Sequence, residues 1–125
     1  MSVIDLPFDQ RRCVPCEGGV PRLSLAECQP LLKHVSGWVL NDQATMISRS
    51  WLAQDFMEAI GFFDNIAKLA EEEGHHPDLH LTGYRHVRVD IFTHAIGGLS
   101  ENDFILAAKV NAIPFREKRR KGADG

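Results

Sequence analysis

Residues 71–103, EEEGHHPDLHLTGYRHVRVDIFTHAIGGLSEND, decide how this chain folds. The stretch begins where a long helical pattern ends, passes through strand-like segments and reaches the start of a second helical pattern. Two adjacent histidines, His75 and His76, follow the first helix, and His94 ends the last strand-like run. Imidazole titrates near neutral pH and can give or take a proton, so three imidazoles at the ends of elements indicate a site.

Pro77 determines how the chain leaves the long helix. A proline disfavours the helical region for the residue before it, so His75 and His76 should point in different directions. Both histidines lie near the negative end of the helix, which favours imidazolium by about 0.3–1 kcal/mol at an exposed position. Glu71 and Glu72 precede them by four residues, and we expect these acids to accept hydrogen bonds from His75 and His76, respectively.

The first half of the chain predicts a short helix and then a β-hairpin. Ser24 is a helix N-cap, and Glu27 completes a capping box for a helix within residues 25–35. Residues 38–42 and 44–51 are strand-like and are separated by turn residues, which predicts the hairpin.

A long amphipathic helix follows from Asp55, its predicted N-cap, with Glu58 at the capping-box position and Gly74 as its end. Apolar residues recur at spacings of three and four, which predicts about five turns with one face in the core. That predicted face consists of Phe56, Ala59, Ile60, Phe63, Ile66, Ala67, Leu69 and Ala70.

Two further strands are predicted at residues 79–83 and 85–94. In the second strand, alternation directs Val87, Val89 and Ile91 to the core and directs Arg88, Asp90, Phe92 and His94 to the opposite face. Ser100 then caps a last helix over residues 102–113. Asp103 can complete its capping box, and its carboxylate could also orient a nearby imidazole.

The elements follow in the order helix, strand, strand, helix, strand, strand, helix. This order predicts an α+β fold, a four-stranded antiparallel sheet with three helices on one face. With 125 residues, 44% of them hydrophobic and 25% charged, residues 1–125 suit one domain with one core. Residues 1–23 read as an extended arm rich in Pro and Gly, and 116–125 as a frayed basic tail.

Composition excludes several classes of function. The net charge of −3 does not favour binding of nucleic acid. The apolar runs are too short to cross a membrane, and the N-terminal residues lack a signal-peptide pattern, which predicts a cytoplasmic protein. Cys13 and Cys16 form a single CxxC motif, without the second ligand pair of a zinc site or a thioredoxin-like context, so we interpret it as incidental or structural.

The histidines themselves allow three interpretations: polar surface at a helix exit, a metal site, or an acid–base pocket. His76 and His80 are four residues apart, but Pro77 prevents the helical turn that would align them on one metal ion. No Cys or carboxylate stands at a known zinc spacing. The sequence therefore predicts no metal, and it favours the acid–base pocket over the metal site.

The pattern Glu71-x-x-x-His75-His76-Pro77, then Tyr84, His94 and Asp103, resembles the signature of the pterin-4a-carbinolamine dehydratase family. The resemblance covers most of the chain. It includes the N-terminal CVPCEGGVPRLS, which looks like the arm of bacterial members, as well as Trp38, the helix start at residues 55–56 and the stretch THAIGGLSENDF.

The resemblance implies a fold, a reaction and a site. Family members have the α+β fold predicted above and dehydrate 4a-hydroxytetrahydropterin to quinonoid dihydropterin, which recycles the tetrahydropterin cofactor of aromatic amino-acid hydroxylases. The pterin is the substrate, and no metal or organic cofactor is implied. His75, His76 and His94 match the catalytic and substrate-binding histidines, and Glu71 and Asp103 match the supporting acids. The family also implies a homodimer or homotetramer.

Loss of the 4a-hydroxyl group requires a proton on the leaving oxygen, and formation of the quinonoid bond requires removal of the proton from N5. One protonated and one neutral histidine can perform both transfers near pH 7. We expect His76 to be the acid and His75 or His94 to be the base.

Two alternatives to this enzyme remain open. One is a non-catalytic binding module: animal members also act as dimerisation partners of a homeodomain transcription factor, and some relatives that have lost the histidines act as Rubisco assembly factors. This chain keeps all three histidines, which counts against the second of these roles. A pterin-binding protein of a folate or molybdopterin pathway is the other alternative.

Overall fold

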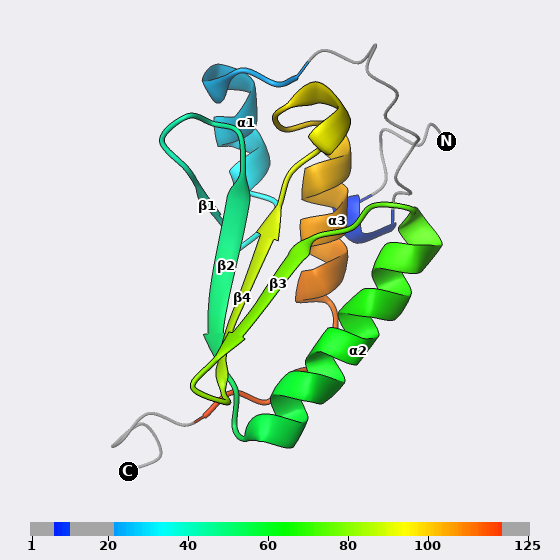
Figure 1. The fold of residues 1–125 in the computed structure, drawn as a ribbon. Helices are drawn as coiled ribbons and strands as arrows, with labels where there is room; N and C mark the ends of the chain where they lie inside the picture. Colours follow the sequence, from blue (N-terminus) through cyan, green and yellow to red (C-terminus); the bar gives the residue numbers. More distant parts are fainter. Residues whose placement is uncertain (1–6, 11–21, 119–125) are drawn as a thin grey trace.

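The computed structural model describes residues 7–10 and 22–118 of the chain (Figure 1). Within these residues the elements follow in the predicted order, which confirms the α+β assignment. A short 3-10 turn, η2, precedes them and another, η3, precedes the last helix. The elements are η2 (Phe8–Gln10), α1 (Leu25–Leu32), β1 (Val39–Leu40), β2 (Ile47–Leu52), α2 (Phe56–Glu73), β3 (Asp78–Thr82), β4 (His86–Ile91), η3 (His94–Ile96) and α3 (Glu101–Asn111).

The described strands form one antiparallel sheet of four strands in the order β1-β2-β4-β3. Val89 of β4 lies between Arg49 of β2 and Leu79 of β3, so β4 is hydrogen-bonded on both sides. The helices cover one face of the sheet, and the opposite face is open (Figure 1). This arrangement leaves β3 at an edge, and only Pro77 separates its first residue, Asp78, from the histidine pair.

The core lies between the sheet and the helices. Val87, Val89 and Ile91 are at most 1% exposed, as the alternation in the sequence predicts. Helix α3 is buried along most of its length, and Phe104 and Leu106 are fully enclosed. The helix that carries Asp103 is therefore fixed firmly to the sheet, because apolar burial of this kind is the main stabilising contribution in a small domain.

The helix ends follow their predicted caps. Two of the three predicted capping boxes are present, Ser24 with Glu27 and Ser100 with Asp103, whereas Glu58 does not complete the box predicted with Asp55. The side chain of Asp55 accepts a hydrogen bond from the backbone of Glu58, whereas the Glu58 carboxylate accepts one from the backbone N–H of Arg116. Helix α2 ends at Gly74 in the left-handed conformation, with φ of 65°.

The buried face of α2 differs from the predicted one. Ala59, Phe62, Ile66 and Ala70 are the buried residues of this helix, and Phe62 was not part of the predicted face. Phe56 and Ile60 are 48% and 41% exposed, and Ala67 is exposed as well. The apolar stripe is wider than the face that the sheet and α3 can cover, so the sequence pattern alone placed its centre wrongly.

The ends of three predicted segments also differ. Strand β4 stops at Ile91, because Thr93 instead pairs with Gly98 across the tight loop that contains η3. In the predicted arm, Phe8 is buried and packs on the ring of His34, whereas Cys13 and Cys16 lie outside the described residues. In the predicted tail, the backbone of residues 116–118 is hydrogen-bonded to residues 52–54. Residues 119–125 are not described.

Candidate active site

The imidazole of His75 turns into the protein. After the left-handed residue Gly74, the side chain of His75 lies against α3, with its Nε2 atom 2.6 Å from Oδ1 of Asp103. The His75 side chain is 12% exposed and that of Asp103 is 0% exposed. The prediction that Glu71 accepts a hydrogen bond from His75 is therefore wrong. The helical geometry on which a spacing of four residues depends ends at Gly74.

Asp103 has both of the roles that its sequence position allows. It is the third residue of α3, and its Oδ2 accepts hydrogen bonds from the backbone N–H of Ser100 and from Oγ1 of Thr93, both at 2.8 Å. Its Oδ1 faces His75. Several donors and the positive end of a helix stabilise a carboxylate that would otherwise be costly to bury.

This arrangement selects one tautomer of His75. Since Asp103 can only accept when it is ionised, Nε2 of His75 must carry the proton of their hydrogen bond. In the neutral ring, Nδ1 is then the free acceptor. The pair has the form in which a carboxylate orients a catalytic imidazole.

The next histidine is placed in the opposite way. The side chain of His76 is 62% exposed, and its Nε2 lies 3.2 Å from Oε1 of Glu71, which is 79% exposed. The partner of His76 is thus Glu71, five residues before it, and not the predicted Glu72. An exposed pair of this kind contributes about 0.2–1 kcal/mol at most.

His94 lies on the η3 turn and not on the strand where alternation placed it. Its exposed ring packs against Phe92, with ring centroids 4.2 Å apart and a tilt of 48°. Neither nitrogen of His94 is hydrogen-bonded to another residue within the described ranges. The ring is therefore fixed by packing, while both nitrogens stay available to a ligand.

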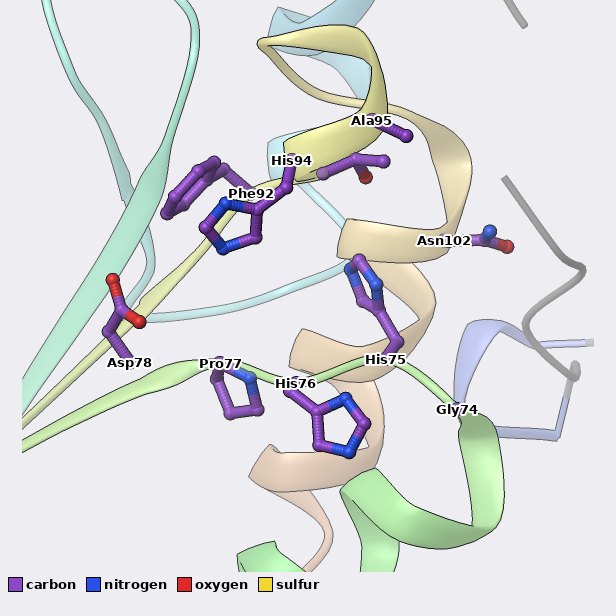
Figure 2. A pocket seen from close by; sticks show the side chains of 10 residues that line it. Gly74, His75, His76, Pro77, Asp78, Phe92, His94, Ala95 and Asn102 are labelled. Atoms are coloured by element: carbon purple, nitrogen blue, oxygen red, sulfur yellow. The ribbon is translucent and has the colours of Figure 1, made fainter. Parts of the chain in front are cut away.

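All three histidines line one cavity of about 300 Å³, within the size range of small-ligand sites. In Figure 2 the rings of His75 and His94 lie on one side of the chain that leads into β3, and the ring of His76 lies on the other. The remaining lining residues are Gly74, Pro77, Asp78, Phe92, Thr93, Ala95 and Asn102. Glu71 and Asp103 contact the histidines from outside this lining.

Sequence reasoning assigned no role at the site to Thr93 or Asp78. Thr93 directly precedes His94 in the loop between β4 and η3, and its hydroxyl donates a hydrogen bond to Asp103. Asp78 follows Pro77 and was placed before the predicted strand, whereas it is the first residue of β3. Its position next to the histidine pair was the signal that could have identified it.

A second polar cluster lies on the open face of the sheet. Asp90 is 6% exposed and accepts hydrogen bonds from Ser48 Oγ at 2.6 Å, Arg88 Nε at 2.8 Å and His80 Nε2 at 2.9 Å. Burial raises the pKa of Asp90, but these hydrogen bonds and the charge of Arg88 outweigh it and hold the pKa below its ordinary value.

In the part of the chain that the structure describes, no group of three or more His, Cys, Asp or Glu side chains is placed to hold a metal ion. No described helix is both long enough and apolar enough to cross a membrane.

Fold and site together define an α+β domain with a histidine acid–base pocket at one end of its sheet. The family model for pterin 4 alpha carbinolamine dehydratase matches residues 21–113. This chain therefore belongs to the pterin-4-alpha-carbinolamine dehydratase family, and with it to the dehydrating lyases.

Two relatives agree with this assignment. Pterin-4-alpha-carbinolamine dehydratase 2, mitochondrial, of Arabidopsis thaliana is 48% identical over 123 residues, which are 96% of this chain and 65% of the plant protein. A protein assigned as the same dehydratase in Methylococcus capsulatus is 47% identical over 103 residues, 82% of this chain and 90% of its own length. The chain thus spans less than two thirds of the plant relative and nearly all of the bacterial one.

A crystal structure described as a transcriptional coactivator/pterin dehydratase from Brucella melitensis is 36% identical, with a TM-score of 0.68. It covers 73% of this chain and 96% of its own. A pterin dehydratase-like protein identified as a RuBisCO assembly factor in the alpha-carboxysome is 23% identical, with a TM-score of 0.52 over 61% of this chain and 87% of its own. At that identity the second likeness shows the fold alone.

Proposed function

We propose that this protein dehydrates 4a-hydroxytetrahydropterin to quinonoid dihydropterin and thereby returns the pterin to a recyclable form. The observation that carries the proposal is the short hydrogen bond between His75 and the fully buried Asp103, beside a cavity that two further histidines line. Membership of the dehydratase family supports the choice of substrate.

The reaction needs one proton acceptor and one proton donor. We assign the acceptor to His75, because Asp103 fixes its Nε2 as a donor and leaves Nδ1 to take the proton from N5 of the substrate. The electron pair of the N5–H bond then forms the C4a–N5 double bond as the C4a–O bond breaks. The leaving oxygen takes a proton and departs as water, so the enzyme gains one proton and loses one.

The donor is assigned to His94. The sequence favoured His76, but its ring is hydrogen-bonded to Glu71 and lies on the other side of the chain from His75 (Figure 2). The ring of His94 lies on the same side as His75 and has both nitrogens open to a ligand. We assign His76, with Glu71, to substrate binding at the rim of the cavity.

The chemistry balances without a further group, so we propose that neither a metal ion nor an organic cofactor takes part. The cytoplasm stays the predicted location.

Self-association is also proposed. Phe56, Met57 and Ile60 expose 48%, 74% and 41% of their surface near the start of α2, and such a patch favours contact with another protein surface. Light scattering at micromolar concentration should show a homodimer or homotetramer, and a monomer would contradict this expectation.

Stopped-flow measurement of 4a-carbinolamine decay tests the proposed reaction. We expect the pure protein to accelerate the decay and His75→Ala to abolish most of the acceleration. His86→Ala is a matched control, since His86 is exposed at the start of β4 and does not line the cavity. A wild-type protein that leaves the decay unchanged would refute the function.

The alternative is a pterin-binding or protein-assembly module without catalysis. The description of the Brucella protein as a coactivator and dehydratase favours keeping this alternative. It predicts a stable complex with a partner protein that survives removal of both His75 and His94.

A further inference from the structure

The cavity contains one carboxylate that the proposed chemistry does not use. Asp78 is the only acidic residue among the described residues that line it, and its side chain is exposed at the first position of β3. Figure 2 shows its carboxylate on the same side of the chain as the rings of His75 and His94. Within residues 7–10 and 22–118 this side chain makes no hydrogen bond or ion pair.

The cations nearest to Asp78 along the sheet are already engaged. Asp78 stands directly opposite Asp90 in the β3–β4 pairing, and His80 stands opposite Arg88. Both His80 and Arg88 direct their hydrogen bonds to Asp90, which Ser48 also contacts. Asp78 therefore faces another carboxylate without a counterion of its own, an arrangement that costs free energy between opposite strand positions.

The other acids of the site cannot replace Asp78 as an acceptor for a ligand. Asp103 is fully buried and receives hydrogen bonds from His75, Thr93 and Ser100. Glu71 is hydrogen-bonded to His76 and is not part of the cavity lining. A ligand that enters the cavity with paired N–H donors meets Asp78 as its available carboxylate.

A pterin carries such a pair of donors. Its 2-amino group and its N3–H lie side by side on the pyrimidine ring, in the spacing that two carboxylate oxygens accept as a bidentate pair. We propose that Asp78 binds this edge of the pterin and so selects 2-amino-4-oxo rings. The inference rests on the proposed function for its substrate class.

The consequence is orientation of the ring. With the pyrimidine edge on Asp78, the C4a–N5 side is directed to the part of the cavity where His75 and His94 lie. Asp78 thus determines binding and specificity, and the proton transfers remain with the histidines. Its removal should raise KM and leave kcat nearly unchanged.

Asp78→Asn tests this assignment, because asparagine keeps the size but presents one acceptor and one donor to the two N–H groups. We expect KM for the carbinolamine to rise about 10- to 100-fold, the loss expected for a charged hydrogen-bonded pair, with kcat within about threefold. Asp42→Asn, an exposed residue in the turn between β1 and β2, is the matched control and should change neither constant. A lower kcat with an unchanged KM would overturn the inference.

A binding experiment separates this inference from the proposed function. The probes are 7,8-dihydropterin and its 2-oxo analogue, a lumazine, titrated into the wild type and into Asp78→Asn. We expect the wild type to prefer the 2-amino ring by at least about tenfold, and the variant to lose that preference. A variant that keeps it would overturn the role of Asp78, whatever the wild type does to the carbinolamine. Conversely, a wild type that binds selectively but does not catalyse would refute only the proposed reaction.

Discussion

His75 and His76 are neighbours in sequence and have opposite environments. The side chain of His75 is 12% exposed and meets a fully buried carboxylate that is 28 residues away in the chain. That of His76 is 62% exposed and meets Glu71, a surface acid five residues before it. The difference shows that adjacent residues of one type acquire unequal roles when the backbone directs one to the core and the other to solvent.

The physical cause of this difference lies at the helix exit. Gly74 takes the left-handed conformation and Pro77 disfavours the helical one for His76, so the helix ends and the two imidazoles lie on opposite sides of the chain (Figure 2). A hydrogen bond to a buried charge contributes about 1.5–3 kcal/mol, whereas an exposed ion pair contributes about 0.2–1 kcal/mol. The inner pair, His75 with Asp103, should therefore dominate both stability and activity over the outer pair, His76 with Glu71. The following changes test that ranking.

Removing the inner imidazole should have the largest effect. His75→Ala deletes the proposed proton acceptor, so we expect kcat for carbinolamine dehydration to fall about 10²- to 10⁴-fold, the range of general-base catalysis. His76→Ala should change mainly KM, by about tenfold or less. Stopped-flow kinetics of both variants measures this contrast. Equal losses of kcat would show that the two histidines share the chemistry.

Removing the inner charge should have the next largest effect. Asp103→Asn leaves a buried amide where three donors meet a carboxylate, and we expect the free energy of unfolding to fall by about 2–4 kcal/mol. Urea denaturation measures it. Asp64→Asn, which breaks only the exposed ion pair with Lys68, is the control and should change stability by less than about 1 kcal/mol. A loss no greater than that of the control would contradict the ranking.

The position of Asp103 in its helix could be predicted from the sequence, but its contact with His75 could not. The capping box at Ser100 and Asp103 depends on a local spacing, so the sequence placed both residues correctly. The partner of His75 depends on how α3 packs against the exit of α2, and no local pattern contains that information. His94 was misplaced for a similar reason, because the pairing of Thr93 with Gly98 ends β4 early.

The Asp90 cluster was outside the reach of sequence reasoning altogether. Ser48 and His80 meet Asp90 only because β4 lies between β2 and β3. Alternation showed that Arg88 and Asp90 share a face, but it could not supply the neighbours from other strands. The sequence therefore did not distinguish this buried carboxylate from an ordinary exposed acid on the open face of the sheet.

Loss of the Asp90 carboxylate should have an effect on stability between those of the inner and outer pairs. The pKa of Asp90 is lowered in the folded protein, so its contribution to stability is complete above the ordinary value of 3.8 and is lost as the pH falls through the lower folded value. We expect Asp90→Asn to lower the free energy of unfolding by about 1–2 kcal/mol at pH 7. The difference from the wild type should shrink below about pH 4. Urea denaturation at several pH values measures it, and a difference that grows on acidification would contradict the lowered pKa.

The outer pair should give the smallest effect. Glu71→Gln keeps a hydrogen-bond acceptor for His76 but removes the charge, so we expect the free energy of unfolding to change by less than about 0.5 kcal/mol. The Coulomb attraction in water is weak at this exposure and is screened by salt, so any change should diminish further between low and high ionic strength. Urea denaturation at two salt concentrations, with Glu72→Gln as the matched neighbour on α2, measures both quantities. A loss for Glu71→Gln as large as that for Asp103→Asn would mean that exposure does not separate the two histidines, and the assignment of His75 as the acceptor would lose its physical basis.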